Sequence, residues 1–210
     1  YTNKIFNNFK NLDGVFIKKK IDNIVCEKNK INLFCKEKKY IYDKVIICTG
    51  AYTKHLATAV GDNFPLISER GYHLMFPEQK NQIKRPIAIS NQGIYFTPME
   101  EGLRVAGTVE IGLNNKKINN SRVNWIKKKT FETFNFTEDP ESIWLGHRPT
   151  LPDSLPVIGC SKKNKNILYN FGHQHLGLTL GAISADIIID ILQKNTLNNI
   201  LDSIKPTRFS

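Results

Sequence analysis

The chain has 210 residues, of which 40% are hydrophobic and 23% charged, so its length allows one domain or two small ones. This composition is typical of a folded globular protein and excludes collagens, low-complexity chains and, with only four cysteines, disulfide scaffolds. A formal net charge of +11 raises the question of nucleic acid or an anionic membrane surface as a partner, whereas the longest apolar runs are far shorter than the roughly 18 residues of a membrane span.

The basic residues do not form a recognition pattern. Eleven lysines and five acidic residues lie in the first 50 residues, in runs such as Lys18-Lys19-Lys20 among many Asn and Ile residues. Aromatic residues do not alternate with these lysines as they do in single-strand binding platforms. We therefore expect no nucleic-acid partner, and a basic module that binds nucleic acid or lipid is kept as an alternative.

The cysteines and histidines indicate no metal centre. The spacing of the cysteines includes no C-x-x-C pair, and no Cys or carboxylate stands at a familiar ligand spacing from the histidines. Reduced, apolar thiols are typical of a cytoplasmic protein, which is where we place this one.

Short strands separated by polar turns are predicted at the start of the chain, as in an antiparallel meander. The runs cover residues 15–17, 24–26, 31–35 and 40–42. Residues 45–48 are apolar on both faces, which is typical of a strand buried in a parallel sheet, and a helix-like segment over 52–60 follows.

A hairpin is predicted in the middle of the chain, after a strand over 71–76. Its arms cover residues 93–99 and 103–111, joined by the turn Glu100-Glu101-Gly102. In the second arm four apolar residues share one face, which we expect to be core: Leu103, Val105, Val109 and Ile111.

The rest of the chain is predicted to contain helices over 122–134 and 178–192 and a short strand over 167–171. Three prolines between residues 146 and 159 predict a stiff loop without regular structure.

Three segments carry the motifs: residues 45–52 (VIICTGAY), 144–159 (WLGHRPTLPDSLPVIG) and 171–180 (FGHQHLGLTL). In this order they resemble the C-terminal part of the FAD-dependent amino-acid oxidoreductases of the D-amino-acid oxidase superfamily, nearest to its D-amino-acid dehydrogenase and glycine-oxidase-like members. Residues 69–73 (ERGYH) and 93–99 (GIYFTPM) also fit. The resemblance covers essentially the whole chain.

The resemblance implies an α/β (α+β) fold with an incomplete FAD-binding domain and an antiparallel-sheet substrate domain. Residues 1–60 and 146–210 would belong to the FAD-binding domain, and residues 61–145 to the substrate-binding domain. The G-x-G-x-x-G turn that approaches the FAD pyrophosphate is absent, and the chain begins with Tyr1. We therefore expect a fragment, inactive alone, whose partner is a missing N-terminal dinucleotide-binding half.

Arg148 is the first candidate for chemistry, because a planar guanidinium can hold a carboxylate through two parallel hydrogen bonds. The resemblance assigns it the amino-acid carboxylate, and it places Tyr72, His73 and Tyr95 on strands that cover the substrate. His175 stands where some relatives have a substrate-facing arginine. The alternative for Arg148 is a surface arginine without a role in binding. The alternative for Tyr72, His73 and Tyr95 is that their rings only pack within the sheet.

The turn before the C-terminal helix is the candidate cofactor site, since the amides and positive dipole of a helix N-terminus suit an electron-rich partner. The resemblance makes that partner the flavin ring of FAD; the alternative for His173 and His175 is that they cap the helix. The candidate cofactor-binding residues are Gly50, Ala51, Gly172, His173, Leu176, Gly177, Leu178 and Thr179.

The implied reaction is oxidation of the Cα–N bond of an amino acid, with a D-amino acid as first choice. Hydride would pass from Cα to flavin N5, and hydrolysis of the imino acid would give a 2-oxo acid and ammonia. The sequence leaves the electron acceptor open between oxygen and a quinone, and the second would place the enzyme peripherally on the inner face of the cell membrane. A non-catalytic flavoprotein-like partner subunit is the other alternative.

Overall fold

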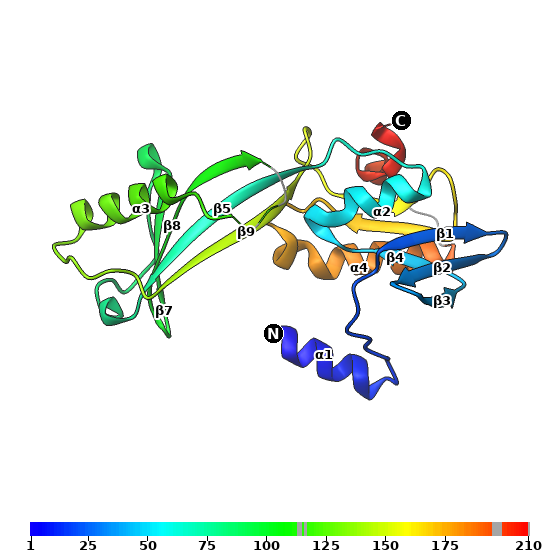
Figure 1. Cartoon of the computed structure of the whole chain (residues 1–210), viewed down its shortest axis with the longest axis horizontal. Coiled ribbons are helices and arrows are strands. Elements are labelled where there is room, and N and C mark those ends of the chain that lie inside the picture. Colours follow the sequence, from blue (N-terminus) through cyan, green and yellow to red (C-terminus); the bar gives the residue numbers. More distant parts are fainter. Residues whose placement is uncertain (113–114, 116, 195–198, 210) are drawn as a thin grey trace.

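The computed structural model describes residues 1–112, 115, 117–194 and 199–209. Two lobes lie side by side, and the long strands β5 (Ile67–Phe76) and β9 (Ser142–Thr150) run from one toward the other (Figure 1). We call them the mixed lobe, which contains parallel and antiparallel strands, and the antiparallel lobe. This is the mixed α/β fold with antiparallel sheets that the sequence predicts.

The mixed lobe begins with the predicted meander. Its strands are β1 (Asn23–Glu27), β2 (Lys30–Cys35) and β3 (Lys38–Tyr42), and each pairs antiparallel with the next. Ile24 and Ile31 are buried in the core of this lobe, so the meander packs its apolar side chains inward and leaves its lysines in solvent.

The second sheet of the mixed lobe has the order β10 (Val157–Cys160), β11 (Ile167–Phe171) and β4 (Val45–Ile47). β4 runs parallel to β11, which confirms the prediction of a parallel strand and joins segments more than 100 residues apart. Helix α2 (Thr53–Val60) follows β4 through the 3-10 turn η1 (Gly50–Tyr52), and helix α4 (Gly177–Gln193) follows β11.

The antiparallel lobe is a sheet with the order β6, β7, β8, β5, β9. β6 covers Ile87–Ile89, β7 covers Ile94–Met99 and β8 covers Gly102–Gly112, so the predicted hairpin is confirmed. Helix α3 (Asn120–Thr133) covers one face, where its Val123 and Ile126 join a buried cluster. The opposite face is not covered by a helix of the described residues, and we call it the open face.

A β-bulge corrects the predicted core face of β8. Thr108 has a φ of 57°, and the register between β5 and β8 shifts by one residue beside it. A one-residue shift moves every later side chain to the other face of a strand. Leu103 and Val105 are buried as predicted, but Val109 is 42% exposed and Ile111 73% exposed, while Glu110 turns toward α3.

The proline-rich stretch is not a loop throughout, which corrects the prediction for residues 146–159. β9 continues to Thr150 and includes Pro149, and β10 begins at Val157. Among the described strands β9 pairs with β5 alone and so lies at the sheet edge, where proline is tolerated because its missing N–H is not needed for a ladder bond. Arg148 therefore projects from a strand, and the expected boundary between residues 145 and 146 falls inside β9.

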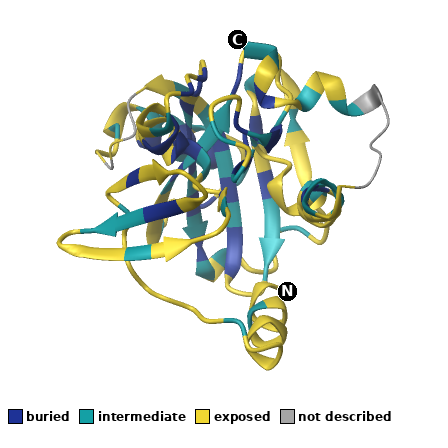
Figure 2. Cartoon of the chain, turned by 90° about the vertical axis from the view of Figure 1, so that its right-hand side faces the viewer, coloured by how far each residue is buried: buried dark blue, intermediate teal, exposed yellow. Residues whose placement is uncertain are grey.

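The start of the chain differs from the prediction. Helix α1 (Thr2–Asn11) precedes an extended segment, and residues 15–17 form no strand although a strand was predicted there. None of the residues of α1 is buried (Figure 2). An edge-to-face pair of Phe6 and Phe16 joins the helix to the extended segment. Of the helices that the structure describes, none is both long enough and apolar enough to cross a membrane.

Candidate active site

The candidate cofactor residues meet at one edge of the mixed lobe. Because β4 and β11 are parallel neighbours, their carboxyl ends lie at the same edge of the sheet, where ligands bind in open α/β sheets. Gly50 and Ala51 follow β4, and the turn from Gly172 leads from β11 into α4. Gly50 has a φ of +54° and Gly172 a φ of +86°, so both turns use backbone conformations that favour glycine. We call this edge the cofactor edge.

The N-terminus of α4 is free for an electron-rich group. Among the described residues, no side chain caps this end and no acidic residue lies in its first turn. Gly177, Leu178 and Thr179 are exposed, and the first amides of a helix have no partner within the helix. The positive end of the helix therefore faces outward at the cofactor edge.

His173 is anchored rather than free. Its Nε2 lies 2.9 Å from the hydroxyl oxygen of Ser184, which is buried on α4. Burial lowers the pKa of His173, so its ring is neutral at pH 7. The backbone N–H of Leu176 donates to the carbonyl of His173 at 2.8 Å and closes the turn, while His175 is exposed beyond it. His173 thus fixes the turn to the helix.

Arg148 lies on the open face, where it is paired. Its Nη1 is 3.2 Å from Oε1 of Glu69, the residue directly opposite on β5, and Oγ1 of Thr150 donates to Oε2 of Glu69 at 2.9 Å. The other nitrogens of the guanidinium lie over Gly71, where an added Cβ would be 2.6 Å from Nη2. Glu69 therefore holds one edge of the guanidinium. The sequence did not single out Glu69, because its partner lies 79 residues away.

His73 and Tyr95 share the open face with Arg148. His73 is opposite Trp144 on β9 and Ala106 on β8, and Ala106 is opposite Tyr95 on β7. These four side chains form one row across the sheet, because paired residues point to the same face. The rings of His73 and Trp144 are stacked, with centroids 4.8 Å apart and planes 14° apart. Burial, and then the charge of Arg104, lower the pKa of His73, so this ring is also neutral at pH 7.

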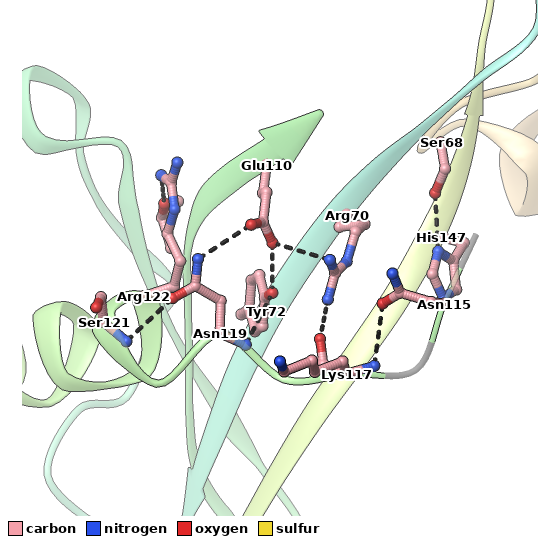
Figure 3. Close-up of polar contacts among 11 residues, drawn as sticks. Ser68, Arg70, Tyr72, Glu110, Asn115, Lys117, Asn119, Ser121, Arg122 and His147 are labelled. Atoms are coloured by element: carbon pink, nitrogen blue, oxygen red, sulfur yellow. Dashed lines mark hydrogen bonds and ion pairs between the residues drawn. The ribbon is translucent and has the colours of Figure 1, made fainter. Parts of the chain in front are cut away.

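Tyr72 lies on the opposite face, under α3, because neighbouring residues of a strand point to opposite sides. Its hydroxyl donates to Oε2 of Glu110 at 2.7 Å (Figure 3). Glu110 also accepts from Nδ2 of Asn119 at 3.0 Å and pairs with Nη1 of Arg70 at 3.3 Å. Burial and the bond to Glu110 raise the pKa of Tyr72. The structure thus separates Tyr72 from Arg148 and places it in a structural polar cluster.

The antiparallel lobe approaches the cofactor edge through the end of β9. This part of the strand contacts η1, and the ring of His147 packs edge-to-face against that of Tyr52 with centroids 6.1 Å apart. Nδ1 of His147 is 2.8 Å from the hydroxyl oxygen of Ser68, which fixes the strand end. Arg148 is the next residue, so the guanidinium is held where the two lobes meet.

A cavity of about 740 Å³ lies elsewhere, beside the meander. Its lining comprises Lys18, Lys19, Lys20, Asp22, Cys35, Lys36, Glu37 and Lys38. Exposed lysines dominate it, and it includes neither the open face nor the cofactor edge.

The sequence matches the family described as DAO, FAD dependent oxidoreductase, over residues 1–191. The chain belongs to this family. Its cofactor is FAD, so the family and the cofactor expected from the sequence are confirmed. Curated relatives and solved structures show how much of the length of a whole family member the chain covers.

Among curated relatives, the chain is 34% identical over 174 residues to a D-amino-acid oxidase of Bradyrhizobium diazoefficiens, a match that covers 80% of this chain and 41% of the relative. It is 29% identical over 154 residues to a D-amino acid dehydrogenase of Vibrio cholerae, covering 71% of this chain and 36% of that protein. The crystal structure of glycine oxidase from Geobacillus kaustophilus has the same fold, with a TM-score of 0.78 at 18% identity, over 90% of this chain and 52% of that one. The chain thus spans about half the length of these proteins or less.

Proposed function

We propose that this DAO-family chain supplies the substrate-binding sheet of an enzyme that oxidises the Cα–N bond of an amino acid, with a D-amino acid as first choice. The observation that carries the proposal is the placement of Arg148. Its guanidinium lies on the open face next to the cofactor edge, and Glu69 holds it from one side. The remaining N–H groups can bind a substrate carboxylate in the bidentate manner that arginine favours.

The residues at the cofactor edge fit the flavin part of FAD. Gly50 leaves open space after β4, since an added Cβ there would meet no atom within 4 Å. Residues Gly177 to Thr179 are exposed, so the first amides of α4 can offer hydrogen bonds to an electron-rich ring. When bound there, FAD would supply the acceptor for the hydride that leaves the substrate Cα. The substrate becomes an imino acid, which water hydrolyses to a 2-oxo acid and ammonia.

The protein's own contribution is orientation and electrostatics. Arg148 fixes the carboxylate, and the neutral ring of His73 lines the sheet beside it, in the same row as Tyr95. The N-terminus of α4 favours negative charge at the cofactor edge. No strong protein base is required, because the amino group needs only to lose its proton to solvent.

A dinucleotide-binding part completes the enzyme in this proposal. β4 is the outer strand of its sheet, and its Ile46 is exposed. Helix α4 carries apolar side chains on its outer side, where Leu178 is 72% exposed and Ile183 is 54% exposed. An open strand edge beside an exposed apolar helix face is typical of a surface that another element covers. Residues 1–60 and 146–210 would join that part, and residues 61–145 would form the substrate domain.

We propose a cytoplasmic setting for the enzyme. The four cysteines are free thiols, which suits a reducing cytoplasm. Oxygen or a membrane quinone would reoxidise the flavin, the second with the enzyme at the inner face of the membrane. Steady-state assays with oxygen and with a soluble quinone would distinguish these acceptors.

The proposal is tested on the flavin-loaded enzyme that contains this chain. Anaerobic addition of a D-amino-acid mixture should bleach the flavin absorption, and the same mixture of L-amino acids serves as the comparison. Arg148→Lys keeps the positive charge but loses the two parallel N–H donors of the guanidinium, so the KM for the amino acid should rise at least tenfold. Arg85→Lys, an exposed arginine remote from the site, is the matched control. A protein that binds flavin but bleaches with no amino acid would overturn the proposal and favour a non-catalytic subunit.

A further inference from the structure

Two glycines face each other beneath the candidate site. Gly71 of β5 and Gly146 of β9 are a directly opposed pair, and both would point a side chain to the open face. A Cβ on Gly71 would lie 2.6 Å from Nη2 of Arg148, and a Cβ on Gly146 would lie 1.8 Å from Cη2 of Trp144. The pair therefore forms a platform against which the guanidinium of Arg148 and the six-membered ring of Trp144 pack.

We propose that Trp144 determines substrate specificity by receiving an aromatic or large apolar side chain of the amino acid whose carboxylate Arg148 holds. This inference rests on the proposed function. Opposed residues in an antiparallel pair are about 5 Å apart. This spacing of Gly71 and Gly146 matches the separation between the carboxylate and the side chain on the Cα of an amino-acid substrate. Trp144 is exposed although it is large and apolar, and its accessible ring faces the same side as the free edge of Arg148.

The indole is held in one orientation, as a recognition surface requires. His73 stacks on it at 4.8 Å, and the ring of His73 is neutral because burial lowers its pKa. Ala106, the next residue in the row, is small and leaves space between His73 and Tyr95. Glu69 already neutralises Arg148 on one side, so the platform offers a single carboxylate position followed by an apolar surface.

The test measures binding rather than turnover. The ligands are 3-phenylpropanoate, which has a carboxylate and a ring but no amino group to oxidise, and propanoate, which lacks the ring. Isothermal titration of the flavin-loaded enzyme gives a Kd for each. In Trp144→Leu the ratio of the Kd of propanoate to that of 3-phenylpropanoate should fall about two- to twelvefold, because stacking contributes about 0.5–1.5 kcal/mol. Trp125→Leu makes the same change on α3, which covers the other face of the sheet, and should keep the ratio.

The two glycines separate the contributions. Gly146→Ala keeps Trp144 in the chain but forces its indole off the platform. Only the preference for the ligand that has a phenyl ring should then be lost. Gly71→Ala displaces the guanidinium, so both ligands should weaken equally. A ratio unchanged in Trp144→Leu and Gly146→Ala, while Arg148→Lys weakens both ligands, would refute the role of Trp144 and leave the proposed function intact. Binding unaffected by Arg148→Lys would overturn both.

Discussion

The polar cluster under α3 gives the sharpest stability prediction. Glu110 accepts hydrogen bonds from Tyr72 and Asn119 and pairs with Arg70, whose side chain is only 8% exposed. Arg70 also donates to the carbonyl of Lys117. Replacing Glu110 with Ala would leave a buried guanidinium without its counter-ion and two donors without an acceptor.

The magnitude follows from how deeply the pair is buried. Removing one partner of a buried ion pair costs about 3–5 kcal/mol. The side chain of Glu110 is 22% exposed, so water would partly replace it, and we expect the lower end, about 3 kcal/mol. Tyr72→Phe removes one hydrogen bond to a charged acceptor that keeps its other partners, so it should cost about 1.5 kcal/mol.

Urea unfolding followed by circular dichroism measures both values, provided that the dependence on urea concentration is the same for all variants. Glu110→Gln is the matched control for shape, since it retains acceptor capacity without the charge. A loss below about 1 kcal/mol in Glu110→Ala would refute the assignment of a buried, structural ion pair.

The same cluster predicts a dependence on pH. Hydrogen bonds from Tyr72 and then Asn119, together with the charge of Arg70, hold the pKa of Glu110 below its ordinary value. Its stabilisation is therefore complete above the ordinary glutamate pKa of about 4.3 and is lost as the pH falls below that value. The difference in urea midpoint between the native chain and Glu110→Gln should shrink over that acidic range.

Three further predictions concern the mixed lobe. Tyr169 is fully buried and its hydroxyl donates to Asp62 at 2.9 Å, so Tyr169→Phe should cost about 1.5–3 kcal/mol in urea unfolding. Because burial lowers the pKa of His173, stability should fall as the pH drops below about 6.5, and His173→Asn, which can still bond Ser184, should reduce that fall; an equal slope would contradict the assignment. Leu178→Lys should make the chain alone more soluble and weaken its assembly with the proposed dinucleotide-binding part at least tenfold in a titration; unchanged assembly would place the contact elsewhere.

The sequence predicted the elements where local pattern decides them. The meander, the parallel strand β4 and the helices α2, α3 and α4 follow from periodicity and turn residues. β9 was missed because its proline suggested a loop, and only its position at the sheet edge makes that proline harmless. Residues 15–17 have the composition of a strand, but a strand needs a partner, and they have none among the described residues.

The sequence motifs were sufficient to predict several residues of the candidate site. Arg148, His73 and Tyr95 come to one face, whereas Tyr72 could not accompany His73, because adjacent residues alternate. Glu69 and Trp144 were not singled out, since their roles depend on a register between strands far apart in the chain. The bulge at Thr108 is a further long-range feature that the alternating pattern of β8 conceals.

Gly71 shows why both faces of the sheet matter to the candidate site. On the open face its missing side chain makes room for the guanidinium of Arg148. On the other face its neighbours Arg70 and Tyr72 are both tied to Glu110, which the bulge at Thr108 turns toward α3. An ion pair and a hydrogen bond on the α3 face fix the backbone of β5, which therefore keeps its position when a ligand binds on the open face. The polar cluster therefore supports the candidate site through the backbone of β5, without any of its side chains reaching the open face.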